Sequence, residues 1–105
     1  MKYTDIEKVL AIYEERSFTA AAKRLYMTQP AISQNIAQLE KELNVLLFVR
    51  DNGKIIPTPA CDAFIGYASK IRNLWNELEK EMKAHQPNHI LPIGTTSFFF
   101  RFLSF

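Results

Sequence analysis

Short polar side chains gather on one face of a helix predicted over residues 28–43, TQPAISQNIAQLEKEL. Hydroxyl and amide groups donate and accept hydrogen bonds, and a glutamine can pair with the edge of adenine through two of them. The chemistry open to this face is therefore hydrogen-bonded recognition, for example of nucleic-acid bases. Taken alone, the same face is explained more simply as a solvated helix surface. The face and its N-terminal tip consist of Thr28, Gln29, Pro30, Ser33, Gln34, Ala37, Gln38 and Lys41.

Residues that could support catalysis or metal binding are few. The single cysteine, Cys61, excludes an intrachain disulfide and a cysteine metal cluster, and we interpret it as a small helix residue. His85 and His89 stand four residues apart, but Pro87 between them argues against a continuous helix that would pair them as metal ligands. The chain has three glycines and no glycine-rich phosphate loop. The sequence therefore predicts no enzyme activity, no metal site and no cofactor.

The composition is that of one folded domain with an appended element. Hydrophobic residues make up 48% of the 105 residues and charged residues 23%, as in ordinary globular proteins. The net charge of +2 is compatible with a nucleic-acid partner but does not argue for one. We find neither a secretory segment nor an apolar run of roughly 18 residues, so we expect a cytoplasmic protein with no membrane partner.

Two short helices are predicted before the polar one. Apolar spacing predicts the first up to about Glu15, opened by a capping box in which Thr4 and Glu7 satisfy each other's backbone donors. An alanine-rich second helix then begins at Ser17 or Thr19. Its small residues favour the close approach of another helix.

The helix over residues 28–43 has clear signals at both ends, and a hairpin follows it. Thr28 is a suitable N-cap, Pro30 fits the first turn, and Asn44 can adopt the left-handed stop conformation. Asn52-Gly53, between two β-prone runs, is a strong hairpin signal. Three helices and a hairpin are the order of a winged helix-turn-helix, in which the third helix enters the major groove of DNA. The predicted fold is mainly α.

Basic residues are few but could meet DNA phosphates. Residues 1–59 contain 8 Lys+Arg against 7 Asp+Glu, a net charge of +1, so phosphate attraction must come from local clustering. Arg50 and Lys54 flank the predicted hairpin tip, while Lys23 and Arg24 lie on the second helix. Lys23 and Lys41 could each equally be a solvated surface charge.

A long helix is predicted over residues 60–86, and its apolar residues are separated by 4, 3, 4, 3 and 4 positions, as in a heptad seam. Such a helix is roughly 40 Å long, and its stripe must be buried against something. We favour self-association over packing within the chain. The predicted dimerisation residues are Phe64, Ala68, Ile71, Trp75, Leu78 and Met82.

Residues 16–50, RSFTAAAKRLYMTQPAISQNIAQLEKELNVLLFVR, resemble the N-terminal signature of LysR-type transcriptional regulators. That signature joins Ser-Phe-Thr, an Ala-Ala pair, Ser/Thr-Gln-Pro/Ser-Ala-hydrophobic-Ser, Leu-Glu and Leu-Phe-x-Arg. The matching residues are Ser17, Phe18, Thr19, Ala21, Ala22, Leu25, Thr28, Gln29, Pro30, Ala31, Ile32, Ser33, Ile36, Leu39, Glu40, Leu43, Leu47, Phe48 and Arg50.

The resemblance implies a sequence-specific DNA-binding transcriptional regulator that binds a partly palindromic operator as a dimer, with a higher oligomer left open. It implies a DNA-binding domain at residues 1–59, a linker and dimerisation helix at 60–86, and the truncated start of an effector-binding domain at 87–105. The implied DNA contacts are Thr28, Gln29, Pro30, Ser33 and Gln34, with Arg50, Gly53 and Lys54 on the DNA backbone.

The chain departs from the family pattern in ways that change the expectation. Gln34 occupies a position that is often Arg, which argues against a guanine contact and favours adenine or a looser base preference. Family members are much longer, so we expect no complete effector pocket here and a small-molecule effector only in a full-length protein. An alternative is an interaction protein whose long helix and aromatic tail, residues 97–105, pair with full-length relatives and block them.

Overall fold

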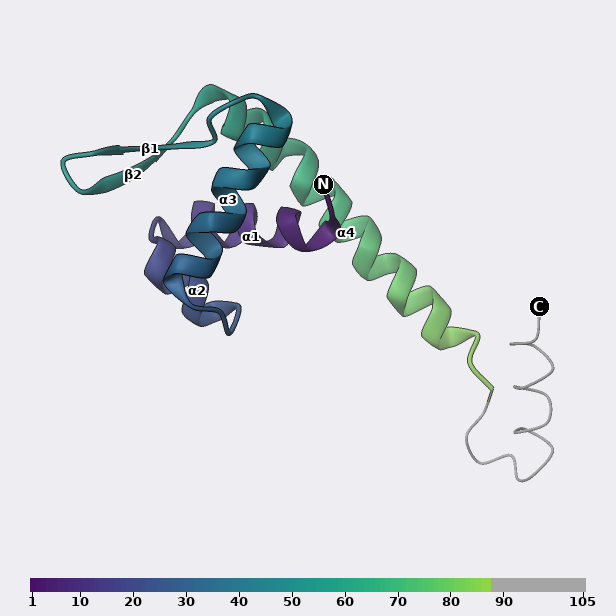
Figure 1. The fold of residues 1–105 in the computed structure, drawn as a ribbon. Helices are drawn as coiled ribbons and strands as arrows, with labels where there is room; N and C mark the ends of the chain where they lie inside the picture. Colours follow the sequence, from purple (N-terminus) through teal and green to yellow (C-terminus); the bar gives the residue numbers. More distant parts are fainter. Residues whose placement is uncertain (88–105) are drawn as a thin grey trace. The chain divides into compact units, whose positions relative to one another are not determined.

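The computed structural model describes residues 1–87, and the chain divides into two compact units, Met1–Asn73 and Leu74–Phe105. Figure 1 shows three helices, a two-stranded hairpin and a long helix in chain order. The predicted fold class, mainly α with a winged helix-turn-helix followed by a long helix, is confirmed. The elements are α1 (Tyr3–Glu15), α2 (Phe18–Arg24), α3 (Gln29–Leu43), β1 (Phe48–Asp51), β2 (Lys54–Pro57) and α4 (Pro59–Ala84).

Side-chain caps open α2 and α3 where the sequence predicted them. Ser17 Oγ accepts a hydrogen bond from the Ala20 N–H at 3.0 Å, and Thr28 Oγ1 accepts one from the Ala31 N–H at 3.3 Å. The helix predicted up to about Glu15 is present, but its predicted Thr4–Glu7 capping box is wrong, because the helix begins at Tyr3 and Thr4 is already inside its first turn. The carboxylate that reaches back to the helix start belongs to Asp5, which accepts from the Lys2 N–H at 2.8 Å.

The core of the first unit lies between α1, α2 and α3 and is closed by the start of α4. Ala21 and Ala22 are buried, as their small size suggested. Ala11 and Ile12 are also fully buried, which the amphipathic pattern did not predict, because α1 is covered on more than one side. The main core cluster consists of Val9, Ala11, Ile12, Ala21, Ala22, Ile32, Ile36, Leu39, Leu47, Phe48 and Cys61.

Cys61 is a core residue in the first turn of α4. Its side chain is buried, and burial raises the pKa of the thiol to about 11. A thiol with such a pKa is protonated at neutral pH and is a poor nucleophile. Within residues 1–87, no group of three His, Cys, Asp or Glu side chains could hold a metal ion. No helix in the same part of the chain is long and apolar enough to span a membrane.

The hairpin has the turn that Asn-Gly favours. Its strands are antiparallel, and Asp51 pairs with Lys54 across a two-residue loop. Asn52 and Gly53 both have positive φ, 50° and 77°, as in the turns that match the twist of paired strands. A Cβ on Gly53 would meet nothing within 4 Å, so the requirement for glycine is conformational rather than steric.

The first turns of α4 correct part of the predicted dimerisation seam. Ala68 is 1% exposed and packs against Ile6 and Leu10, with Phe64 beside them. Surface that is buried within the chain cannot be buried again against a partner, so Ala68 belongs to the domain core, and the half-buried Phe64 packs against that core. The remaining seam residues are between 39% and 53% exposed: Ile71, Trp75, Leu78 and Met82.

Several predictions concern residues beyond position 87. His89, the aromatic tail of residues 97–105 and all but the first residue of the segment 87–105 lie outside the described residues.

Candidate nucleic-acid interface

α3 separates a core face from a polar face. Consecutive residues of an α-helix are rotated by about 100°, so residues 32, 36 and 39 fall within about 60° of one another. These three residues, Ile32, Ile36 and Leu39, are buried. The polar face is on the other side of the helix, and all of the following are exposed: Pro30, Gln34, Ala37, Gln38 and Lys41.

Two of the predicted reading residues are bonded to each other. Gln29 Nε2 donates to Ser33 Oγ at 2.7 Å, one turn along α3, and both side chains are half-buried. The bond restricts the glutamine side chain before any partner arrives. It leaves the amide oxygen, one amide hydrogen and the serine hydroxyl hydrogen to face a partner. This pair is therefore a preorganised set of donors and acceptors at the N-terminal end of α3.

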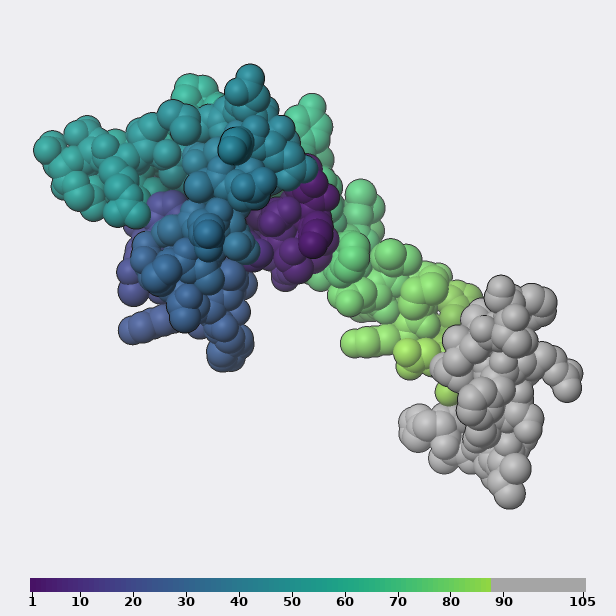
Figure 2. Space-filling model, in the orientation of Figure 1, coloured from purple at the N-terminus to yellow at the C-terminus, as the bar shows by residue number. Residues whose placement is uncertain are grey.

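The wing, which is the hairpin formed by β1 and β2, is anchored to the C-terminal half of α3 by Glu40. Glu40 Oε2 accepts from the Leu47 N–H at 2.7 Å and from the Phe48 N–H at 3.3 Å, at the start of β1. Residues 29, 33 and 40 fall within about 40° of one another around a helix. Gln29 and Ser33 thus lie on the flank of α3 that faces the base of the wing. Figure 2 shows α3 on the surface of the first unit, with the hairpin projecting beside it.

The other side of the wing base is held by Thr58. Its hydroxyl donates to the Leu46 carbonyl at 2.5 Å and its N–H donates to the Leu47 carbonyl at 2.9 Å. The same hydroxyl oxygen accepts from the Cys61 N–H at 3.1 Å, which caps the start of α4. The wing is therefore fixed from two helices, and its position relative to α3 does not depend on the hairpin alone.

We expect the Glu40→Ala variant to lose about 2 kcal/mol of unfolding free energy, since two backbone N–H groups lose their acceptor. The Glu40→Gln variant keeps a neutral acceptor and should lose about half as much. Thermal or urea unfolding of the 105-residue chain measures both. Glu42→Ala is the matched control, because the Glu42 carboxylate is 47% exposed and pairs with the N-terminal amine, a contact worth little. A Glu40→Ala chain as stable as the Glu42→Ala chain would contradict this role.

Arg50 has its guanidinium held over an aromatic ring. Its Cζ lies 5.2 Å from the centroid of the Phe18 ring, and that ring contacts Phe48 edge to face at 6.0 Å. The contact is a cation–π interaction, and a guanidinium carries five N–H donors, so donors remain available to a phosphate. Lys54, in the paired strand, is exposed. Phe18 was matched only as part of the signature, and no sequence signal indicated that it would contact Arg50.

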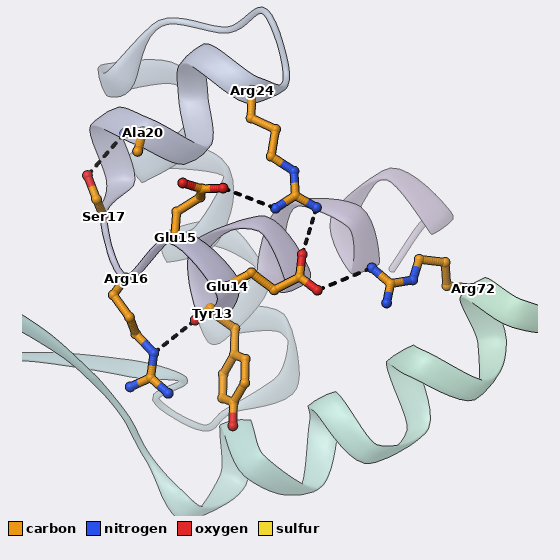
Figure 3. Close-up of polar contacts among 8 residues, drawn as sticks. All are labelled: Tyr13, Glu14, Glu15, Arg16, Ser17, Ala20, Arg24 and Arg72. Atoms are coloured by element: carbon orange, nitrogen blue, oxygen red, sulfur yellow. Dashed lines mark hydrogen bonds and ion pairs between the residues drawn. The ribbon is translucent and has the colours of Figure 1, made fainter.

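Arg24 is not available to DNA in the way the sequence suggested. Its guanidinium binds Glu14 at 2.7 Å and Glu15 at 3.3 Å, and Glu14 also binds Arg72 of α4 at 3.4 Å (Figure 3). The Arg24 hydrogen bond holds the pKa of Glu14 below its usual value. This network ties α1, α2 and α4 together, so Arg24 is a structural cation. Lys23 and Lys41 are exposed.

Gln38 lies away from the Gln29–Ser33 pair. By helical spacing it is about 180° around α3 from Gln29. It lines a shallow groove of about 290 Å³ together with residues from the start of α1, including Lys2, Thr4 and Lys8. Of the predicted reading residues, Gln38 is therefore the one on the α1 side of α3.

Comparison with known proteins agrees with this architecture. Residues 3–62 match the family of bacterial regulatory helix-turn-helix proteins, lysR family. The HTH-type transcriptional regulator HdfR of Yersinia enterocolitica is 38% identical over 93 residues, which cover 88% of this chain and 31% of that protein. The chain thus spans about a third of the length of this curated relative.

Two similar solved structures are complexes with DNA. The CbnR DBD–DNA complex has a TM-score of 0.75 and 31% identity, covering 83% of this chain and 100% of that one. The BenM DBD bound to catB site 1 DNA has a TM-score of 0.79 and 31% identity, covering 85% and 99%. In both cases the similarity extends over more than four fifths of this chain.

Proposed function

The chain belongs to the LysR family of bacterial regulatory helix-turn-helix proteins, and we propose that it is a sequence-specific DNA-binding module that works as a dimer. The family is one of transcriptional regulators, and we propose that this chain has no catalytic activity of its own. We also propose that it acts in the cytoplasm, where a bacterial regulator meets its DNA.

The Gln29–Ser33 pair on the wing-facing flank of α3 is the observation that carries the proposal. α3 is proposed to enter the major groove with its N-terminal end, where Thr28, Gln29 and Pro30 meet the bases. Ser33, Gln34 and Gln38 extend the contact along the helix, and a glutamine favours adenine. The wing is proposed to bind the DNA backbone through Arg50, Gly53 and Lys54.

The exposed stripe of α4 supports self-association. At about 100° per residue, positions 67, 71, 74, 75, 78 and 82 fall within about 100° of one another. An apolar stripe of this kind on an otherwise polar helix is typical of a helix that pairs with another. We propose that a second copy of the chain covers it. The stripe consists of Tyr67, Ile71, Leu74, Trp75, Leu78 and Met82, all of them exposed.

We propose residues 1–59 as the DNA-binding domain and residues 60–86 as the linker and dimerisation helix. The first compact unit extends to Asn73 because the first turns of α4 pack on the domain. The assignment of residues 87–105 to the start of an effector-binding domain stays a prediction.

Selection of duplexes from a random pool by the wild-type chain tests the proposal. We expect enrichment of one partly palindromic sequence whose half-sites are roughly one helical turn, or a multiple of it, apart. A pool that stays unenriched would contradict sequence-specific binding. An unenriched pool, combined with stable pairing of this chain to longer relatives in sedimentation, would instead favour an interaction protein that blocks those relatives.

A further inference from the structure

Four residues other than glycine adopt positive φ in residues 1–87: Arg16, Tyr26, Asn44 and Asn52. Asparagine visits this left-handed region readily. At Arg16 the cost of the left-handed conformation is offset by side-chain contacts. Its Nε donates to the Tyr13 carbonyl at 2.8 Å, and its guanidinium lies 4.7 Å from the centroid of the Tyr13 ring (Figure 3). Tyr26 has a φ of 57°, but it is neither an asparagine nor held by side-chain contacts like those of Arg16.

Tyr26 stands in the turn between α2 and α3, at a position where glycine fits best. The Tyr26 N–H donates to the Lys23 carbonyl at 3.2 Å, and the Met27 N–H donates to the Ala22 carbonyl at 2.8 Å. These two bonds form the left-handed stop of a helix, which usually ends on glycine. The Tyr26 side chain is 97% exposed, so packing does not explain why a tyrosine is tolerated here.

We propose that Tyr26 is a DNA-backbone contact whose phenol hydroxyl donates to a phosphate oxygen beside the bases met by the N-terminal end of α3. This inference rests on the proposed function. Tyr26 is two residues before the Thr28 cap, so its ring leaves the chain next to the candidate reading residues. Tyrosine hydroxyls are ordinary donors to DNA phosphates. Lys23, exposed at the end of α2, adds a cation to the same turn.

Two substitutions separate the binding role from the backbone strain. Tyr26→Gly removes the backbone strain of a left-handed tyrosine and should raise Tm by about 2 to 5 °C. The same variant should weaken duplex binding about 5- to 10-fold, because the phenol is lost. Asn44→Gly is the matched control, since Asn44 occupies the equivalent stop at the end of α3, with φ of 57°. It should not lower Tm or change affinity. Fluorescence anisotropy and thermal unfolding of the 105-residue chain measure both quantities.

Tyr26→Phe tests the hydroxyl itself. We expect it to weaken binding about 3- to 5-fold, and equally for the selected duplex and for a mixed-sequence duplex of about 25 base pairs, because phosphate contacts carry no sequence information. Wild-type affinity in Tyr26→Phe, or a loss confined to the selected duplex, would overturn the assignment. The inference alone fails if Gln29→Ala reduces specific binding while both Tyr26 variants bind like wild type. The proposed function fails if the wild-type chain does not distinguish the two duplexes.

Discussion

A chain with alanine at both Gln29 and Ser33 is expected to bind the duplex selected by the wild-type chain roughly 100-fold more weakly. The two side chains are joined by a hydrogen bond of 2.7 Å, so each holds the other in place for the bases. Losing both should cost about 3 kcal/mol of binding free energy, since each tenfold change corresponds to about 1.4 kcal/mol. Binding to a mixed-sequence duplex should change little, because the phosphate contacts remain. Anisotropy titrations at one fixed salt concentration measure both.

The comparison variant is Gln38→Ala, which removes a proposed contact on the α1 side of the same helix. It removes one amide, as Gln29→Ala does, and we expect it to weaken specific binding by less than about 5-fold. Undiminished binding of the selected duplex by the double variant would show that the wing-facing flank of α3 does not read bases. A 100-fold loss in Gln38→Ala would instead place the reading surface on the opposite flank.

Leu78→Glu is expected to convert the proposed dimer into a monomer at micromolar concentration. The Leu78 side chain is 53% exposed and stands in the middle of the exposed stripe. A glutamate there would face its own copy across the seam, and burying two unpaired carboxylates is strongly unfavourable. Affinity for a two-half-site duplex should fall by roughly 100-fold or more, because the two reading helices would no longer bind as one unit. Sedimentation equilibrium and anisotropy test the two effects.

Asn76→Glu is the matched control for that charge. It adds the same carboxylate to α4, about 160° around the helix from Leu78, on the polar side. We expect it to leave the mass in solution unchanged. A Leu78→Glu chain with the wild-type mass would mean that the stripe is not the dimer interface. In that case, a partner other than a second copy would have to cover Tyr67, Ile71 and Leu74.

The local features of the fold could be predicted from the sequence, because each depends on residues within a few positions. Ser17 and Thr28 cap helices through backbone groups three residues away. Asn52-Gly53 specifies its own turn, and Asn44 ends α3 as expected. The polar face of α3 followed from helical spacing, and the order of the elements and the family resemblance made it a candidate reading face. Spacing also indicated an apolar stripe on α4, although not where that stripe passes from the core to the surface.

Contacts between distant residues could not be predicted in this way. Nothing near Glu40 in the sequence indicates that it would bind the N–H groups of residues seven and eight positions later. Arg24 was a predicted phosphate contact, and the sequence did not indicate that it would pair with Glu14, ten residues earlier. Ala68 fits a heptad as well as its neighbours do, yet the packing of α4 on α1 buries it.

The sequence by itself determined the family, the order of the elements, the polar face of α3 and the turn of the wing. Caps, turns and helical periodicity depend on short-range sterics and hydrogen bonds that near neighbours specify. Only the tertiary structure decided which charged side chains form ion pairs within the chain and which apolar residues of α4 remain exposed. It also decided how Glu40 and Thr58 hold the wing beside α3. These outcomes depend on where separate helices come together, and that is set by the packing of the whole core.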